Sequence, residues 1–299
     1  RPRVLVTGAS GMLGRQIMAA LSPDEWEVRG LCFSKAAQCP DLVACDLSVE
    51  GAATREVEEF QPYAVIHLAA EWRPDELRRH PARTRRLNVD AAGAIAAACQ
   101  RCGAWLLYLS ADSVFDGRCA PYSVDAVATP LSEYGWHKLH GEQLTIVACP
   151  RAVILRVSLL YGPCTAVADS AVTSLHADLV AGVREVDAWQ RCYPTWAPDV
   201  ASVIVAMLKK HRHGEAESLR GVFHWQGTER LTWHDMMLHI AEIVGFDAST
   251  ISAVYTPPAA PLPRDTQLDC SRLEAVLGEA AVGRLRTPFR EGLERCLRP

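Results

Sequence analysis

Short, wholly apolar segments alternate with longer amphipathic segments through the first half of the chain. The apolar segments predict strands at residues 3–8, 27–33, 64–70, 104–110 and 152–162. The longer segments predict helices at residues 12–22, 88–103 and 134–149. Strands that are apolar throughout and are separated by helices are typical of a parallel sheet that is covered on both faces. The pattern therefore predicts a doubly wound α/β fold.

After Gly162 the pattern loosens, and the second half predicts a smaller lobe. Helices are expected at residues 169–183, 193–210, 232–246 and 287–297, with a strand at 221–227 and a proline-rich loop at 255–265. We expect a large α/β domain at residues 1–162 and a smaller lobe of substrate-binding type at residues 163–299. Part of the second half, about residues 195–226, is expected to return to the main sheet.

The composition is that of a soluble globular protein. Hydrophobic residues make up 49% of the chain, charged residues 22%, and the formal net charge is −4. A negative chain without a broad basic surface argues against nucleic-acid binding, and the basic run at residues 78–86 is interpreted as a solvated helical face. No segment reaches the ~20 apolar residues that span a bilayer, so we expect no membrane contact. The first residues already predict a strand, so no signal peptide is expected.

Eleven cysteines are scattered without a disulfide framework, which favours free thiols in a reducing, cytoplasmic compartment. The one Cys-x-x-Cys pair, Cys99 and Cys102, has no second pair, and the histidines form no ligand pattern. We therefore expect no metal site.

The sequence TGASGMLG, residues 7–14, lies between the first predicted strand and the first helix. Its glycines, Gly8, Gly11 and Gly14, allow a tight turn and a close approach of the backbone to a ligand. The N-terminus of the following helix presents free N–H groups and a positive dipole end to a pyrophosphate. A purely structural turn is the alternative. The surrounding alternation of strands and helices favours a dinucleotide site, so residues 1–162 are interpreted as a Rossmann domain.

The end of the second strand indicates which dinucleotide binds. An NAD protein places a carboxylate about 20 residues after the glycine loop to hold the ribose hydroxyls. This chain has Phe33, Ser34 and Lys35 there instead. Lys35 can neutralise a 2′-phosphate, which favours NADP, and the alternative is that Lys35 is an ordinary exposed lysine.

Tyr134 and Lys138 lie four residues apart on a predicted helix and therefore share one face. A phenol titrates near ~10, and a neighbouring ammonium group stabilises its phenolate. Such a phenol can give its proton to a carbonyl oxygen as hydride arrives, and the lysine can also hold the nicotinamide ribose. The pair predicts a reductase-type site in which both residues also bind the cofactor.

Two groups of motifs resemble known proteins. A resemblance to the dTDP-4-dehydrorhamnose reductase branch of the extended short-chain dehydrogenases/reductases rests on TGASGMLG, AVIHLAAEWRPD, LNVDAAG, VFDG, YGWHKLHGE and LRVSLLYG. A more specific resemblance, to the regulatory β subunits of methionine adenosyltransferase, rests on EWRPD, WQRCYPTWAPDVA, GVFHWQG, QLDCSRLE and RTPFREGL. The second resemblance runs from about residue 3 to about residue 297, and it is preferred because its motifs are dense.

The resemblance implies contacts along an entire NADP molecule. Around the pyrophosphate it implies Ser10, Gly11, Met12 and Leu13, and around the 2′-phosphate Phe33, Ser34 and Lys35. Near the adenine it implies Asp46 and Leu47, near the pyrophosphate-to-ribose stretch Leu68, and near the nicotinamide Leu160. Tyr134 and Lys138 match the family in kind.

Three positions depart from the family pattern. The pair of cations after the second strand is reduced to Lys35, which implies a softer NADP preference. The hydroxyl at the end of the strand at residues 104–110 is replaced by Ala111, and Ser113 stands where the family has a tyrosine.

A neighbouring serine is the available substitute for the missing hydroxyl. Ser110 is adjacent to Ala111 and points to the opposite face of a strand. Ser113 points to the same face as Ala111 if the strand stays extended past Asp112, so Ser113 is a candidate catalytic residue. Loss of one oxyanion-type donor costs about 10²–10³ in rate, so we expect slow chemistry at this site.

Two functions follow from these observations. The first is an NADP-binding regulatory subunit, with a vestigial reductase site, whose partner is the catalytic subunit of methionine adenosyltransferase. The second is an NADPH-dependent reductase of a nucleotide-linked 4-keto sugar. Ala111 favours the first, whereas Tyr134 and Lys138 fit both. The resemblance also implies docking through a C-terminal tail, which would follow Pro299.

Overall fold

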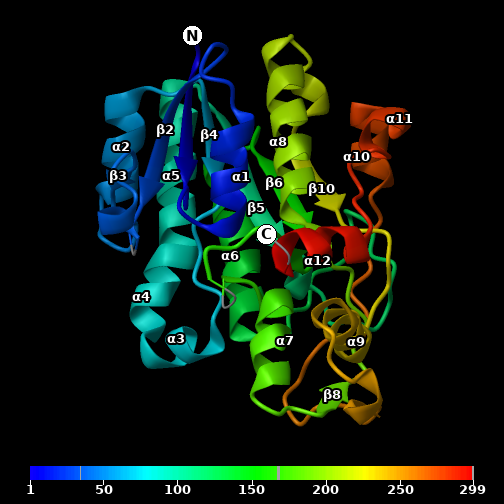
Figure 1. Cartoon of the computed structure of the whole chain (residues 1–299). Helices are drawn as coiled ribbons and strands as arrows, with labels where there is room; N and C mark the ends of the chain where they lie inside the picture. Colours follow the sequence, from blue (N-terminus) through cyan, green and yellow to red (C-terminus); the bar gives the residue numbers. More distant parts are fainter. Residues whose placement is uncertain (34, 167–168, 298–299) are drawn as a thin grey trace.

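The computed structural model describes residues 1–33, 35–166 and 169–297, and at its centre lies a parallel sheet (Figure 1). The strands of this sheet are, in chain order, β1 (Arg3–Thr7), β2 (Glu27–Cys32), β3 (Val43–Ala44), β4 (Ala64–His67), β5 (Trp105–Ala111), β6 (Val153–Val157) and β10 (Gly221–Trp225). Their order across the seven-stranded sheet is β10-β6-β5-β4-β1-β2-β3, with parallel pairings. The predicted doubly wound α/β fold is therefore confirmed.

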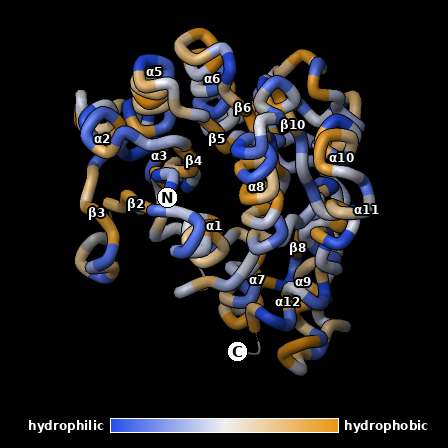
Figure 2. The backbone as a smooth tube through the Cα atoms, turned by 90° about the horizontal axis from the view of Figure 1, so that it is seen from above, coloured by the Kyte–Doolittle hydropathy of each residue, from blue (hydrophilic) through white to orange (hydrophobic). Residues whose placement is uncertain are grey.

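Helices cover both faces of this sheet, as Figure 2 shows from above. One face carries α2 (Ala52–Phe60), α5 (Ala91–Cys102) and α6 (Glu133–Ala148), and the other carries α1 (Met12–Ala20) and α8 (Ala197–Arg212). Shorter elements follow the strand ends: η1 (Ala36–Gln38), α3 (Pro74–Arg79), α4 (Pro81–Arg85), the π-helix η2 (Arg86–Asp90) and the 3₁₀ helix η3 (Asp112–Val114).

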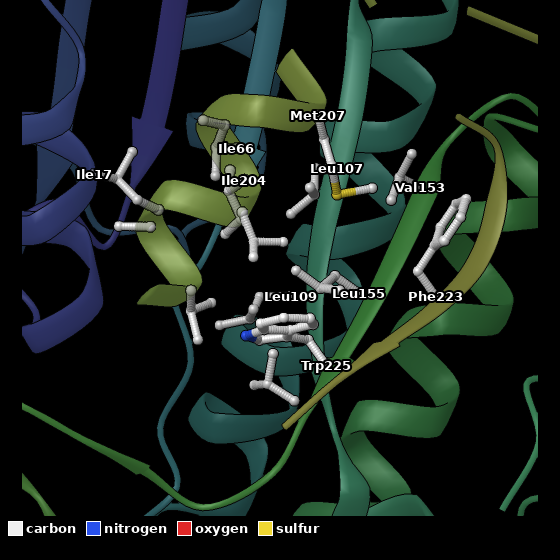
Figure 3. Close-up of a cluster of buried hydrophobic side chains, with 14 of the residues drawn as sticks. Ile17, Ile66, Leu107, Leu109, Val153, Leu155, Ile204, Met207, Phe223 and Trp225 are labelled. Atoms are coloured by element: carbon white, nitrogen blue, oxygen red, sulfur yellow. The ribbon is translucent and has the colours of Figure 1, made fainter. Parts of the chain in front are cut away.

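Alternation along each strand sends successive side chains into two separate cores. In β1, Val4 and Val6 pack in the core below α1 and α8, whereas Leu5 packs in the core below α2 and α5. Figure 3 shows part of the first core, where Ile17 and Ile204 of the helices lie over side chains of the strands. Each fully buried Val, Leu or Ile contributes roughly 1.5–3 kcal/mol. Burial on both faces explains why these strands are apolar throughout, and it holds the ends of the strands in place.

The second half of the chain supplies both a small lobe and parts of the sheet. Before α8 come β7 (Leu160–Tyr161), α7 (Ala171–Val180), β8 (Glu185–Asp187) and β9 (Thr195–Trp196). Beyond α8 come η5 (Ala216–Ser218), β10, α9 (Trp233–Val244), η6 (Ala248–Thr250), β11 (Ser252–Val254), α10 (Ser271–Leu277), α11 (Glu279–Val282) and α12 (Phe289–Leu297). β10 joins the main sheet beside β6, with Phe223 opposite Leu155. A third core, formed mainly by α7, α9 and α12, belongs to the lobe.

The strand order reverses at β1: β2 and β3 are added on one side of β1, whereas β4 and the later strands are added on the other side. Ligands of doubly wound folds bind outside the carboxyl ends of the strands at such a switch point. In Figure 1 the strands run toward the end of the molecule where α7 and α9 lie. The fold therefore places a candidate site between the ends of β1 and β4 and the small lobe.

In the described ranges, no helix combines the length and the apolar character needed to cross a membrane. The eleven cysteines are free thiols, as predicted.

Candidate functional site

The glycine loop after β1 packs closely against the end of β4. Gly8 has a φ of +66°, in the left-handed region, and a Cβ there would lie 3.0 Å from the backbone of Ala69. A Cβ on Gly14 would lie 2.2 Å from the carbonyl oxygen of Gly8. Gly11 is the N-cap of α1 and has no side chain that could satisfy the first N–H groups of the helix. These residues fit a pyrophosphate, because the loop leaves room for close backbone approach and no N-cap side chain competes for the first N–H groups of the helix.

The other residues predicted in this loop contribute in different ways. Ser10 is buried, and its carbonyl oxygen accepts a hydrogen bond from Arg15 at 2.7 Å. The side chain of Leu13 is buried in the core between the sheet and α1, so Leu13 offers a ligand only its backbone. Met12 is half-buried and lies 3.7 Å, sulfur to sulfur, from Cys164 in the segment after β7.

Thr7 connects the ends of β1 and β4. Its hydroxyl oxygen accepts hydrogen bonds from the N–H groups of Leu68 and Ala69, each at 3.1 Å. The same hydroxyl lies 2.7 Å from Nδ1 of His67. Burial, together with the charge of Lys138, lowers the pKa of His67 to about 3, so the imidazole is neutral. Because the Thr7 oxygen already accepts from two N–H groups, its O–H donates the hydrogen bond to Nδ1 of His67. This network positions the predicted contact Leu68 beside the glycine loop.

Arg83 connects Phe33, predicted at the 2′-phosphate, with Asp46, predicted at the adenine. Phe33 is 52% exposed, and the guanidinium carbon of Arg83 lies 4.9 Å from the centre of its ring. Arg83 also lies 3.4 Å from a carboxylate oxygen of Asp46. The side chain of Leu47 is buried in the core below α2 and α5. Ser34 lies outside the described residues. Arg83 belongs to the basic run at residues 78–86, and the sequence pattern gave it no role at the site.

Lys35 has a partner that the sequence did not indicate. Its ammonium nitrogen donates to Asp169 at 3.1 Å and to the Thr165 hydroxyl at 3.3 Å. The carboxylate of Asp169 also lies 3.8 Å from Arg15. Burial by itself would raise the pKa of Asp169, but hydrogen bonds from Thr165 and Lys35 hold that pKa at about 2. Lys35 is therefore not an ordinary exposed lysine.

Tyr134 and Lys138 lie on the first turns of α6. Ser132 is the N-cap of the helix, and its hydroxyl oxygen accepts a hydrogen bond from the Gly135 N–H at 3.1 Å. Lys138 is only 3% exposed, and its nitrogen lies 4.3 Å from the centre of the Tyr108 ring. The two predicted residues are therefore both held by a capped helix beside the end of β5.

The electrostatics of this pair differ from our expectation. Burial lowers the pKa of Lys138 to about 7. Burial, helped by the carboxylates of Asp112 and Glu71, raises the pKa of Tyr134 well above its usual value. The expectation that the ammonium group would ease ionisation of the phenol is wrong for this structure, because the cost of burying charge is larger. The raised pKa makes the Tyr134 phenol a weaker proton donor than an ordinary tyrosine.

The lowered pKa of Lys138 predicts a pH dependence of stability. An unfolded lysine titrates near ~10.4, whereas folded Lys138 titrates at about 7. Between these values the unfolded chain binds a proton that the folded chain releases. The free energy of unfolding should therefore rise above about pH 7, by up to about 1.4 kcal/mol per pH unit. Lys138→Met should remove this rise and stabilise the chain below about pH 7.

Urea unfolding at a series of pH values measures this effect. Lys209→Met is the matched control, because Lys209 is 45% exposed and pairs with Glu25 on the surface. The control should keep the wild-type dependence on pH. An unchanged slope in Lys138→Met would contradict the assignment.

The end of β5 differs from the geometry that Ser113 required. The strand ends at Ala111, which is extended (φ −141°, ψ 158°), and residues 112–114 turn into η3. The carbonyl oxygen of Ser113 lies 2.2 Å from where a Cβ on Gly135 would be, so Ser113 packs against the first turn of α6. Its hydroxyl is buried without a hydrogen-bond partner in the described part of the chain. The strand therefore does not stay extended past Asp112, which was the condition for Ser113 to share a face with Ala111, and a catalytic role for Ser113 stays a prediction.

Asp112 connects distant parts of the chain at this site. Its carboxylate accepts hydrogen bonds from the hydroxyls of Ser158 and Thr266, each at 2.7 Å. Burial raises the pKa of this carboxyl, while the two hydroxyls act in the opposite direction. Ser158 follows β6, and Thr266 follows the proline-rich loop, so no local motif identified this cluster.

Asn88 holds the loop after β4 against α6. Its side-chain amide makes two 2.8 Å hydrogen bonds with the backbone of Glu71, one to the N–H and one to the carbonyl. The amide nitrogen also lies 3.3 Å from His137, next to Lys138 on α6. Asn88 belongs to the π-helix η2, a geometry that is frequent at functional sites. The motif LNVDAAG indicated the segment but gave Asn88 no role.

Leu160, the predicted contact at the nicotinamide end, lies in β7. It is half-buried, and its carbonyl oxygen accepts a hydrogen bond from the Ser170 hydroxyl at 3.2 Å. The chain after β7 reaches back to α1, because the carbonyl of Pro163 accepts from Arg15 at 3.3 Å. Within the described ranges no cluster of His, Cys, Asp or Glu could hold a metal ion.

Comparisons with known proteins identify the family. The sequence profile described as the RmlD substrate binding domain matches residues 2–299. The chain is 36% identical to methionine adenosyltransferase 2 subunit beta of Bos taurus, over 99% of this chain and 87% of that protein.

Two solved structures extend the comparison to the fold. A dTDP-4-dehydrorhamnose reductase from Clostridium acetobutylicum has a TM-score of 0.81 and 26% identity, covering 99% of this chain and 98% of that one. A dTDP-4-dehydrorhamnose reductase from Bacillus anthracis, solved in complex with NADP, has a TM-score of 0.78 and 26% identity, covering 99% and 97% of the two chains. The chain therefore belongs to the RmlD substrate binding domain family of extended short-chain dehydrogenases/reductases, and it is similar to the β subunits of methionine adenosyltransferase 2.

Proposed function

We propose that this chain is an NADP-binding regulatory subunit of methionine adenosyltransferase, the enzyme that makes S-adenosylmethionine, and that its reductase site is vestigial. The observation that carries the proposal is a contrast within one site. The N-cap residue of α1 is Gly11, which offers no capping side chain, so a pyrophosphate could accept hydrogen bonds from the first N–H groups of the helix. At the reacting end, however, Ala111 has no hydroxyl.

In this proposal NADP is held along the carboxyl ends of the strands. The loop from Gly8 to Gly14 would hold the pyrophosphate, Phe33 and Lys35 would lie at the 2′-phosphate, and Asp46 and Leu47 would lie near the adenine. Tyr134 and Lys138 face the nicotinamide ribose. Bound NADPH would supply a hydride, but its main effect here would be structural. A ligand that binds only the folded state stabilises it by about 2.7 kcal/mol at a 100-fold excess over Kd, which would stiffen a docking surface.

The similarity to the β subunits supports the partner. It extends over 99% of the chain rather than over the cofactor-binding half alone. A catalytic subunit of methionine adenosyltransferase is accordingly the partner that we propose.

Co-purification with that catalytic subunit, with and without NADP, tests the proposal. We expect a complex that survives gel filtration, is more stable with NADP, and changes the kcat or KM of S-adenosylmethionine synthesis. The same preparation should reduce a dTDP-4-keto-6-deoxy sugar slowly or not at all. The regulatory function would be refuted if no complex forms and the kinetics of the synthetase stay the same.

A second function, NADPH-dependent reduction of a nucleotide-linked 4-keto sugar, is favoured by one observation. Tyr134 and Lys138 lie four residues apart on α6, so they share one face of the helix, from which a phenol could donate a proton to a carbonyl oxygen. Rapid turnover by the wild-type chain that is lost in Tyr134→Phe would establish this function in place of the first.

A further inference from the structure

We propose that Asp169 sets the preference between NADP and NAD, because it holds the two cations that face the 2′-phosphate. This inference rests on the proposed dinucleotide site. It adds a specificity-determining carboxylate and a second cation, neither of which the motifs indicated.

Three charged side chains from distant parts of the chain meet at one point. Lys35 comes from the segment after β2, Arg15 from the first turn of α1, and Asp169 from the residues just before α7. The carboxylate of Asp169 lies 3.1 Å from the Lys35 nitrogen and 3.8 Å from a guanidinium nitrogen of Arg15. Their side chains are only 30%, 26% and 19% exposed for Lys35, Arg15 and Asp169, so water and salt screen them less than an open surface pair.

The place where the three meet is where the adenosine ribose of a dinucleotide lies in this fold, beside the end of the second strand. Lys35 follows β2 by three residues. Arg15 directly follows Gly14, and its guanidinium group is held by the carbonyl of Ser10 within the glycine loop at 2.7 Å. A guanidinium group binds phosphate oxygens in a bidentate manner. Arg15 therefore supplies the second cation that the segment after β2 lacks.

Asp169 is anchored rather than free to swing away. Its carboxylate accepts hydrogen bonds from the hydroxyl of Thr165 at 2.8 Å and from the N–H groups of Thr165 and Ala166 at 3.1 and 3.3 Å. A phosphate that binds Lys35 and Arg15 must therefore compete for both ion pairs with a carboxylate that stays within a few ångströms.

The negative charge of Asp169 affects the binding of NADP and of NAD differently. Lys35 and Arg15 carry two positive charges, and Asp169 cancels one of them. A phosphate monoester carries roughly −1.5 to −2 at neutral pH, so Asp169 both repels it and competes with it for the cations. The ribose hydroxyls of NAD are neutral, and a carboxylate near them can accept their hydrogen bonds, as the acid after the second strand does in NAD proteins. Asp169 therefore weakens NADP binding and leaves NAD binding intact.

Titration of the whole chain with NADPH and NADH tests the inference. Asp169→Asn keeps the shape of the side chain and removes its charge. We expect it to tighten NADPH binding roughly tenfold and not to tighten NADH binding. Asp178→Asn is the matched control, because Asp178 is exposed on α7 in the same lobe, and it should change neither affinity.

Two further measurements separate charge from structure. The gain in NADPH affinity should shrink when Asp169→Asn is combined with Lys35→Met or Arg15→Gln, and it should decrease at high salt. Thr165→Val removes one hydrogen bond that anchors Asp169, and it should shift NADPH binding in the same direction by a smaller factor. Thermal unfolding without cofactor verifies that each variant is folded. If Asp169→Asn does not fold, Thr165→Val tests the inference in its place.

The outcomes distinguish this inference from the proposed function. Equal changes for NADPH and NADH, or no change in Asp169→Asn, would overturn the role of Asp169 while leaving dinucleotide binding in place. Failure of the wild-type chain to bind either dinucleotide would overturn both.

Discussion

Replacing Ala111 with threonine should raise the rate of reduction of a nucleotide-linked 4-keto sugar by about 10²–10³-fold. Ala111 is the last residue of β5, and its backbone is extended. A threonine there would restore a hydroxyl at the position where the family pattern has one. Of the two neighbouring serines, Ser110 alternates to the other face of β5, and Ser113 lies beyond the end of the strand. Ser110 is buried with its hydroxyl unpartnered in the described structure, and Ser113 has turned into η3.

Single-turnover oxidation of NADPH in the presence of the sugar nucleotide measures this effect. Ala111→Val is the matched control, since valine has the shape of threonine and lacks the hydroxyl. Cofactor affinity should stay the same in both variants. Equal rates for the threonine and valine variants would show that the missing hydroxyl does not limit the chemistry.

Gly14→Ala should lower the free energy of unfolding by about 3 kcal/mol and abolish dinucleotide binding. A Cβ at this position would lie 2.2 Å from the Gly8 carbonyl oxygen and 2.7 Å from the Ala9 Cα, so α1 and the glycine loop would have to separate. Alanine is otherwise favoured over glycine in a helix by about 1 kcal/mol, so a loss of stability would show that the close approach dominates.

Gly11→Ala separates the effect on binding from the effect on stability. A Cβ on Gly11 would lie 3.1 Å from the Gly8 oxygen, and its φ of −72° suits any residue. We expect a change in stability within about 1 kcal/mol but a clear loss of NADPH affinity, because the methyl group would lie at the N-terminus of α1. Urea unfolding and NADPH titration of both variants measure the two effects. Wild-type stability of Gly14→Ala would contradict the packing argument.

The sequence by itself determined the architecture and the two local motifs of the site. Strands that are apolar on both faces can only be satisfied by helices on both sides of a sheet, so the doubly wound fold followed from the pattern. The glycine loop could be recognised because strand, turn and helix are continuous in the chain. Tyr134 and Lys138 could be paired because residues four apart on a helix always share a face.

The tertiary structure alone decided which groups meet at the strand ends. Lys35 pairs with Asp169 across 134 residues, and Asp112 pairs with Thr266 across 154 residues. It also ended β5 at Ala111, so the strand is not extended past Asp112, as a shared face for Ser113 and Ala111 would have required. Burial in the folded chain lowers the pKa of Lys138 and raises the pKa of Tyr134. Helix and strand patterns depend on near neighbours in the chain, whereas these contacts and charges depend on how all the elements pack, and for that reason no local pattern contains them.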